Sequence, residues 1–284
     1  MNQKSYDGKP TLYIVPTPIG NMEDITIRAL NVLKQVDLIA AEDTRHTLGL
    51  LNHFEISKPL ISYYKQTEKS RSEVLIEKLK EGKNIAIVSD AGTPGISDPG
   101  EEIVKLAIQN NIEIIPIPGA CALINALIVS GLSTREFSFI GFLSTIKKEK
   151  KEKLEEVKFE TRTLILYEAP HKLKGTLEQI FETLGNRNIV LARELTKIHE
   201  EFIRGTVSEI LDRIEEIKGE FVILVEGNNI SKKDLELNNL NSLSLEEHYN
   251  KYESQGLDKK EIIKRIAKDR NVNKNEIYQY FINK

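Results

Sequence analysis

Short apolar runs alternate with segments of helical period along most of the chain, and this alternation constrains the fold more than any other feature. The apolar runs are bounded mainly by turn residues, as strands buried in a sheet are. The segments between them repeat apolar residues at every third or fourth position, as amphipathic helices do. In the first half, strands are expected over residues 12–15, 38–41, 60–63, 85–88 and 112–117. The pattern predicts βα units and a mainly parallel sheet.

Helices are predicted between these strands. Asp24 is expected to cap a helix whose apolar positions are Ile27, Leu30 and Leu33. A second helix is expected over residues 69–81, ending at a glycine, and a third over residues 103–108.

A second series of the same kind follows residue 118. Helices are expected over residues 120–130, 147–158, 172–184 and 207–217, and strands over 137–142, 164–167, 189–192, 201–203 and 221–225. The 147–158 segment mixes Lys and Glu closely enough to predict an exposed helix with i,i+4 ion pairs. A chain of 284 residues has room for two domains. We therefore expect two α/β domains, residues 1–118 and 119–227, with mostly parallel or mixed sheets.

The composition changes after residue 227. Residues 228–243 are rich in Asn, Ser and Lys and are expected to form a linker. Residues 244–284 have a helical pattern, in which Asp258 caps a helix over 259–269 and a turn leads to a second helix over 273–281, a helix-turn-helix-like layout. Residues 257–284 hold eight Lys or Arg against four Asp or Glu. This basic tail either holds nucleic-acid phosphates or is a solvated segment docked on the body.

Charge and cysteine content narrow the class of protein. The net charge of -3 gives no global attraction to nucleic acid or anionic lipid, so such a partner requires a local patch. The single cysteine, Cys121, excludes an intramolecular disulfide and fits a reducing compartment. Residues 1–10 are polar, unlike a signal peptide, and the most apolar stretch, residues 120–129, is far shorter than the roughly 20 residues that span a bilayer. A cytoplasmic protein without a membrane segment is expected.

Several motifs of known chemistry are absent from the sequence. It has no G-x-G-x-x-G after the first strand and no G-x-x-x-x-G-K-[ST], which disfavours a Rossmann dinucleotide site and a P-loop. It also lacks H-E-x-x-H and paired C-x-x-C, and its five histidines are scattered. No metal site is expected.

Three loops rich in Gly, Pro and small residues follow strands of the first half, at the end where open α/β sheets place their ligands. They cover residues 16–21, 89–100 and 118–123. Such residues let a ligand approach the main chain closely, and Asp90 offers a carboxylate at the end of a buried strand. Any one loop is equally well an ordinary βα turn, but the three together favour a ligand cleft.

Six strings, three of which overlap these loops, resemble one family. They are VPTPIGN (residues 15–21), AEDTRHT (41–47), SDAGTPGISDPG (89–100), PGACA (118–122), YEAPH (167–171) and ARELTKIHEEFIRG (192–205). In this order they are similar to the bacterial 16S ribosomal RNA cytidine 2'-O-methyltransferases of the tetrapyrrole methylase superfamily. The likeness runs from about residue 12 to residue 227 and extends weakly into the tail.

The resemblance implies two α/β domains with S-adenosyl-L-methionine in the cleft between them, a homodimer, and methylation of a ribose in the decoding region of 16S rRNA, either as free rRNA or in the 30S subunit. Such a cofactor needs an apolar sleeve, hydrogen-bonding main chain and no metal. By position, the resemblance assigns these residues to the cofactor pocket: Pro18, Ile19, Asp90, Ala91, Gly92, Ile96, Ala122, Leu123, Tyr167, Ala192, Phe221 and Val222.

Methyl transfer to a ribose oxygen is an in-line displacement that depends on orientation and on a group that draws off the hydroxyl proton. Three clusters in the matching strings offer such groups, and in each the alternative is a structural salt bridge or cap. Glu42 stands beside Asp43 and Arg45, which can hold a phosphate; Glu168 stands near His171; and Lys197 stands near His199, Glu200 and Arg204. The catalytic candidates are Glu42, Arg45, Glu168 and Lys197.

Two other functions remain open. The superfamily also methylates carbon atoms of tetrapyrroles and other small molecules, so the fold and cofactor do not fix the acceptor. A non-enzymatic, ligand-sensing nucleic-acid-binding protein would use the tail as reader but leaves the three loops without chemistry. Turnover of the methyl donor distinguishes an enzyme from such a sensor.

Overall fold

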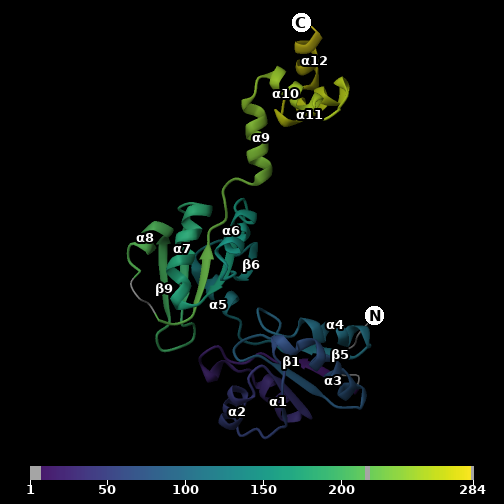
Figure 1. Cartoon of the computed structure of the whole chain (residues 1–284), viewed down its shortest axis with the longest axis vertical. Helices are drawn as coiled ribbons and strands as arrows, with labels where there is room; N and C mark the ends of the chain where they lie inside the picture. Colours follow the sequence, from purple (N-terminus) through teal and green to yellow (C-terminus); the bar gives the residue numbers. More distant parts are fainter. Residues whose placement is uncertain (1–7, 215–217, 283–284) are drawn as a thin grey trace. The chain divides into compact units, whose positions relative to one another are not determined.

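The structure, a computed structural model, describes residues 8–214 and 218–282. Residues 1–7, the end of the helix expected over 207–217, and tail residues 283–284 therefore lie outside the described part. The chain divides into two compact units, Met1–Leu154 with Thr163–Glu226, and Glu155–Arg162 with Gly227–Lys284. Figure 1 shows the elements of both units. No helix in residues 8–214 or 218–282 has the length and apolar character that crossing a membrane requires.

The first sheet of the first unit is wholly parallel, as the alternating pattern predicts. Its order is β3-β2-β4-β1-β5, and every neighbouring pair of strands is parallel. The strands are β1 (Thr11–Ile14), β2 (Leu38–Ala41), β3 (Leu60–Ser62), β4 (Ile85–Val88) and β5 (Glu113–Pro116). Because all five run the same way, their carboxyl ends lie at one edge, where the Gly- and Pro-rich loops begin.

Helices cover both faces of this sheet. On one face, α1 (Ile27–Gln35) and α2 (Thr44–His53) pack against alternate strand residues such as Val15 and Ile39. On the other face, α3 (Glu68–Lys80) and α4 (Glu101–Gln109) pack against Leu12, Ile85 and their neighbours. Successive strand residues point to opposite faces, so the strands, covered on both faces, are mostly apolar. The short 3-10 helices η1 (Met22–Asp24) and η2 (Lys65–Thr67) lie in the connections.

The cap of α1 differs from the expectation. Asp24 ends η1, and Thr26 caps α1 instead, with its Oγ1 accepting a hydrogen bond from the Ala29 amide at 3.1 Å. Threonine and aspartate both serve as caps, and the extended backbone of Ile25 separates Asp24 from the helix. Ile27, expected among the apolar positions of this helix, is the first residue of α1 and is 79% exposed.

The second sheet of the first unit is mixed. Its order is β6-β7-β10-β8-β9, with β6 and β7 parallel and the other neighbours antiparallel. The strands are β6 (Phe137–Phe142), β7 (Thr163–Glu168), β8 (Asn188–Arg193), β9 (Glu201–Thr206) and β10 (Phe221–Val225). One face packs against α5 (Ala122–Ser130) through Leu123, Ala126 and Leu127. The remaining helices of this half are α6 (Lys147–Glu156), α7 (Pro170–Leu184) and α8 (Val207–Leu211).

The charge pattern predicted an exposed helix, but α6 is buried on one side. It buries Lys150 and Leu154, while Lys148 and Glu152 form one of the expected i,i+4 pairs at 3.9 Å. The Lys150 ammonium donates to Thr176 Oγ1 of α7 at 2.9 Å. A buried lysine is tolerated here because its charge has a hydrogen-bonding partner.

The second unit contains four helices within its described residues: α9 (Lys232–Ser242), α10 (Leu245–Glu253), α11 (Lys259–Asp269) and α12 (Lys274–Ile282). Helix α9 lies in the stretch expected as a linker. The Asn-rich composition disfavours a helix, but a capping box between Ser231 and Asp234 starts one. The predicted pair α11 and α12 is confirmed, with Asp258 as the cap of α11.

A small core of its own holds the helices of the second unit together. Ile262, Ile263, Ile266 and Ala267 of α11 are buried with Ile277 of α12. The opposite side of α11 exposes its cations: Lys259, Lys260, Lys264, Arg265 and Lys268. The basic residues of the tail are therefore at the surface of a folded helical unit.

Candidate functional site

Hydrogen bonds join the three Gly- and Pro-rich loops into one surface. The amides of Thr17 and Gly92 each donate to the other's carbonyl, at 2.9 and 3.0 Å, which links the first loop to the second. Thr93 Oγ1 donates to the carbonyl of Ala120 at 2.9 Å, which links the second loop to the third. Gly92 has a φ of +88°, and a Cβ there would lie 3.2 Å from Ile19, so glycine suits this close approach.

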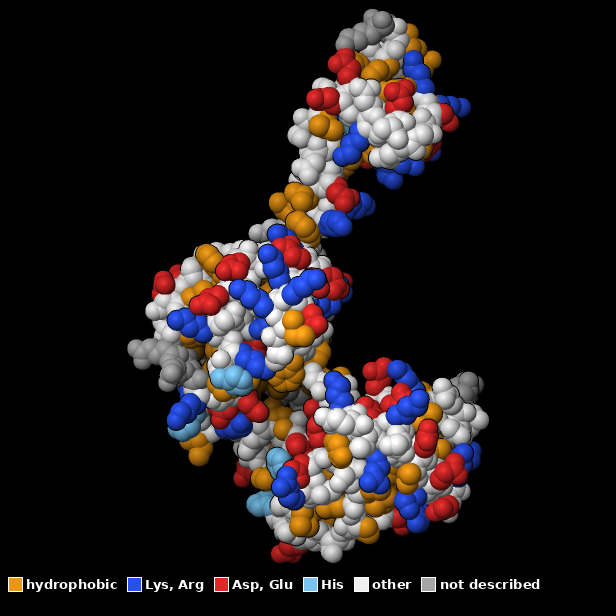
Figure 2. Space-filling model, in the orientation of Figure 1, with side chains coloured by type: hydrophobic (Ala, Val, Ile, Leu, Met, Phe, Trp, Pro, Cys, Tyr) orange, Lys and Arg blue, Asp and Glu red, His pale blue; other side chains and the backbone are white. Residues whose placement is uncertain are grey.

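This surface forms one wall of a cavity of about 570 Å³ whose other wall comes from the second sheet of the first unit. Figure 2 shows hydrophobic side chains gathered in the hollow between the two α/β halves. The second sheet contributes the carboxyl ends of β7 and β8 together with the amino end of β10. These ends meet because β10 is antiparallel to both of its neighbours. The cavity thus lies at matching edges of two sheets, as ligand sites in open α/β folds do.

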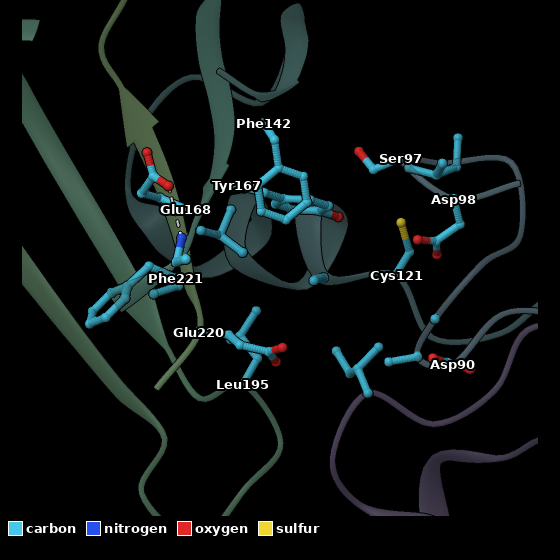
Figure 3. Close-up of a pocket in the computed structure, with 18 of the residues that line it drawn as sticks. Asp90, Ser97, Asp98, Cys121, Phe142, Tyr167, Glu168, Leu195, Glu220 and Phe221 are labelled. Atoms are coloured by element: carbon cyan, nitrogen blue, oxygen red, sulfur yellow. Dashed lines mark hydrogen bonds between the residues drawn. The ribbon is translucent and has the colours of Figure 1, made fainter. Parts of the chain in front are cut away.

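Ten of the twelve residues expected in the cofactor pocket line this cavity, namely Ile19, Asp90, Ala91, Gly92, Ile96, Ala122, Tyr167, Ala192, Phe221 and Val222. The side chain of Phe221 is buried and points away from the cavity in Figure 3, so this residue offers its main chain. Pro18 lines a smaller neighbouring cavity instead. Leu123 lines neither cavity, because its side chain belongs to the core beneath α5.

Tyr167 connects this core to the cavity wall. Its hydroxyl accepts a hydrogen bond from the Leu123 amide at 3.2 Å, in the first turn of α5. Its ring makes edge contacts with Phe139 and Phe142, at centroid distances of 5.0 and 5.5 Å, and Figure 3 shows the Tyr167 and Phe142 rings together. Burial raises the pKa of the Tyr167 hydroxyl above its usual range, so it stays protonated. Tyr167 thus supplies a rigid aromatic surface.

Three carboxylates line the first-sheet side of the cavity: Glu42 after β2, Asp90 after β4, and Asp98 in the second loop. Asp90 Oδ1 accepts from the Asp43 amide at 2.9 Å, which ties the two strand ends together. Burial, and then the charge of Asp90, raise the pKa of Glu42. Burial, with the charges of Glu42 and Asp90, raises the pKa of Asp98 to about 7. The cavity therefore concentrates negative charge that favours either protons or a cationic ligand.

Glu168 lies in the wall, but its carboxylate is engaged in structure. It is 4% exposed, and its oxygens accept from the Ala169 amide at 2.9 Å and from Thr176 Oγ1 at 2.5 Å. Figure 3 shows this carboxylate turned away from the cavity. The geometry favours a structural role at the junction of β7 and α7, where Glu168 is joined through Thr176 to buried Lys150.

Lys197 lines the cavity as a fixed cation. Its Nζ donates to Glu194 at 3.0 Å and to Glu220 at 3.2 Å. Burial alone would lower the pKa of Lys197, but these carboxylates outweigh it and raise that pKa. Lys197 is therefore suited to holding negative charge and unsuited to accepting a proton. The loop that carries it contacts the first loop, since the Asn21 amide donates to Thr196 Oγ1 at 3.1 Å.

Arg45 and Arg204 lie outside the cavity lining. The Arg45 side chain is 90% exposed and pairs with Asp43 at 2.8 Å, and its hydrogen bonds lower the pKa of Asp43 to about 2. Arg204 donates to the carbonyls of Val129 and Ser130 at the end of α5, which is a structural use. His171 does line the cavity, whereas His199 lies outside its lining.

Several lining residues were not singled out from the sequence, including Ser97, Asp98, Cys121, Phe142, Leu195 and Glu220. Ser97 and Asp98 lie within the SDAGTPGISDPG string, so the sequence marked their loop but did not indicate which of its residues line the cavity. Glu220 precedes a strand, and it reaches the site only because β10 runs antiparallel to β7. Strand direction has no signature in a single apolar run.

The comparisons with known proteins agree with this geometry. Residues 11–211 match the family described as Tetrapyrrole (Corrin/Porphyrin) Methylases. Among solved structures, a diphthine synthase superposes with a TM-score of 0.60 and 14% identity, over 80% of this chain and 93% of that one. A uroporphyrin-III-C-methyltransferase from Thermus thermophilus gives a TM-score of 0.56 and 19% identity, over 77% and 94% of the two chains. These structures share the fold.

Much higher sequence similarity links the chain to proteins named Ribosomal RNA small subunit methyltransferase I. The one from Bacillus subtilis is 51% identical over 98% of this chain and 97% of its own length. The one from Halalkalibacterium halodurans is 51% identical over 98% of each chain. The chain is therefore a methyltransferase of the tetrapyrrole methylase family, in the group of relatives that carry this name.

Proposed function

We propose that the protein transfers the methyl group of S-adenosylmethionine to the ribose 2'-hydroxyl of a cytidine in the decoding region of 16S rRNA. The observation that supports this most is the cavity at the matching edges of two sheets, in a chain whose relatives over 98% of its length are named ribosomal RNA methyltransferases. The acceptor atom and the base come from the family resemblance of the sequence motifs.

The residues present fit S-adenosylmethionine. Ile19, Phe142 and Leu195 supply apolar lining, and the loop main chain supplies donors and acceptors. Glu42, Asp90 and Asp98 make no ion pair with a cation among the described residues, so a positively charged ligand would relieve their mutual repulsion. The cofactor supplies a methyl group activated on positively charged sulfur.

The residues of the chain orient the reactants and manage the proton. The main chain of the loops and the ring of Tyr167 form a rigid wall that positions one reactant. This lowers the entropic cost of bringing the two reactants into line. Glu42 and Asp98 are the groups suited to receive the hydroxyl proton, because burial raises the pKa of Glu42 and raises that of Asp98 to about 7. Lys197, whose charge Glu194 and Glu220 partly balance, is suited to donate a hydrogen bond to an oxygen of the acceptor. Glu168 maintains the wall through its hydrogen bonds to the Ala169 amide and to Thr176.

The wider organisation is part of the same proposal. We place the division between the two α/β domains at residue 118, with residues 228–243 and 244–284 as connector and tail. We propose a homodimer in the cytoplasm, with the exposed cations of α11 on rRNA phosphates. The last feature predicts binding that weakens as salt rises.

The test is methyl transfer from labelled S-adenosylmethionine to 30S subunits taken from a strain that lacks the modification. Label on the 2'-oxygen of a decoding-region cytidine, located by nuclease mapping, is the expected result. A cofactor that binds but gives no label on 30S subunits or free rRNA would refute the RNA acceptor and favour a small-molecule acceptor. Light scattering of the purified protein tests the dimer.

A further inference from the structure

A second, smaller cavity of about 230 Å³ adjoins the first on the side of α2. The two share five lining residues, Ile19, Asp90, Ala91, Lys197 and Glu220. The smaller cavity adds Met22 from η1 and His46 and Leu50 from α2. It therefore opens beside the same loop and the same lysine as the larger cavity.

The smaller cavity is lined by both apolar and polar side chains. Pro18, Met22 and Leu50 supply apolar surface, whereas His46, Lys197 and Glu220 supply hydrogen-bonding groups. Planar ligands with an apolar face and a polar edge, as nucleobases have, fit such a lining. With about 30 Å³ for each water, 230 Å³ equals about seven or eight waters, the scale of one pyrimidine base.

His46 is the polar group of this cavity that is most available to a ligand. Its side chain is exposed, and its ring makes no hydrogen bond with any residue of the described part. Lys197, by contrast, is already held by Glu194 and Glu220, so its charge is partly balanced. Thr17 Oγ1 and Ser89 Oγ are also engaged, on main-chain carbonyls. A balanced lysine beside an unengaged imidazole suits the edge of a base better than a free phosphate.

We propose that this smaller cavity is the acceptor subsite, which takes the target nucleoside turned out of the RNA strand. The proposal rests on the proposed function and adds to it the place of the acceptor. Enzymes that act on a nucleotide within a strand take it out of the stack into a pocket. A nucleoside in the smaller cavity lies next to the larger one, because Ile19, Asp90 and Lys197 border both. Arg45, one residue before His46, has a side chain that is 90% exposed and accessible to an RNA phosphate.

A binding experiment tests the subsite without catalysis. The chain has no tryptophan, so His46→Trp and Leu48→Trp each introduce a single fluorescent reporter on α2. Leu48 is 48% exposed and lines neither cavity, which makes it the matched control. A single-stranded RNA oligonucleotide of the decoding-region sequence should quench the emission at position 46 at least twofold and saturably, because bases stack on aromatic rings. No quenching at position 46, or equal quenching at both positions, would overturn the subsite.

A second experiment fills the cavity. Met22→Trp should lower kcat/KM for 30S subunits at least tenfold while the Kd for S-adenosylmethionine, measured by calorimetry, stays within twofold of wild type. Leu48→Trp should change neither quantity. If Met22→Trp keeps full kcat/KM, or if it loses cofactor affinity with an intact fold, the cavity is not the acceptor subsite. His46→Ala, a change at an exposed position, should also lower kcat/KM, by about threefold or more, without altering melting.

Failure of the subsite is distinguishable from failure of the proposed function. A wild-type enzyme that labels no RNA refutes the function itself. A wild-type enzyme that labels the decoding-region cytidine, with unaffected Met22→Trp and His46→Ala variants, refutes only the subsite.

Discussion

Replacing Asp98 with Asn should stabilise the protein above neutral pH. Burial and the charges of Glu42 and Asp90 raise the pKa of Asp98 from 3.8 to about 7, against a hydrogen bond from Ser89. For a fully buried group such a rise corresponds to about 4 kcal/mol, at about 1.4 kcal/mol for each pH unit. Because Asp98 remains partly accessible to solvent, screening reduces the expected effect to about 2 kcal/mol.

The sign of the pH dependence follows from proton binding. Between pH 3.8 and about 7 the folded protein binds a proton at Asp98 that the unfolded chain has lost. The free energy of unfolding therefore falls as pH rises through this window. Asparagine carries no charge, so the Asp98→Asn variant lacks this loss. Its advantage over wild type should grow by about 1 kcal/mol between pH 5 and pH 8 and reach about 2 kcal/mol at pH 8.

Urea unfolding at pH 5, 6, 7 and 8, with linear extrapolation to water, measures this difference. Asp24→Asn is the matched control, since Asp24 is exposed and lines neither cavity. A stability difference that stays constant across the pH range, or an Asp98→Asn variant less stable than wild type at pH 8, would refute the reasoning. The same variant should lose methyl transfer, since a carboxylate suited to accept the proton is gone.

Three further predictions concern the wall, the core contact and the tail. Gly119→Ala should lower stability by about 1–3 kcal/mol and weaken cofactor binding, because its Cβ would lie 2.6 Å from Pro16 Cβ; unchanged melting and calorimetric affinity would contradict this. Tyr167→Phe removes the acceptor for the Leu123 amide and should cost about 1 kcal/mol in urea unfolding, whereas no loss would mean that water replaces the hydroxyl. Ile266→Ala should cost about 2–5 kcal/mol within the second unit alone, because Ile266 belongs to the core of that unit. Hydrogen exchange should then quicken in α11 and α12 and stay unchanged in β1 and β4, so uniform acceleration would argue for one cooperative unit.

Much of the fold was predictable because its causes are local. Strands buried on both faces are short apolar runs, and helices carry a periodic stripe, so both series of elements follow from the sequence. Gly and Pro marked the three loops. Ten of the twelve residues assigned to the cofactor pocket through the family resemblance lie in one cavity, because that resemblance carries positions that only a shared fold brings together.

Other features depended on the local path of the backbone and on which side chains it buries, which residue types alone do not decide. Asp24 and Thr26 are both good caps, and only the path of the chain at Ile25 selects Thr26. Glutamate is a residue type that serves as a catalytic acid or base, but the carboxylate of Glu168 is buried and accepts a hydrogen bond from Thr176. Helix α9 forms in an Asn-rich stretch because a capping box starts it.

The sequence by itself determined the two series of strands and helices, the glycine loops and the basic tail, because these depend on the order of residues along the chain. Only the tertiary structure decided that β10 runs against its neighbours, so that Glu220 meets Lys197. It alone brought Glu42, Asp90 and Asp98 into one cavity, where burial and mutual repulsion raise the pKa of Asp98 to about 7. The pKa of a side chain depends on the burial and the charges that the tertiary structure places around it, and the adjacent sequence does not specify these.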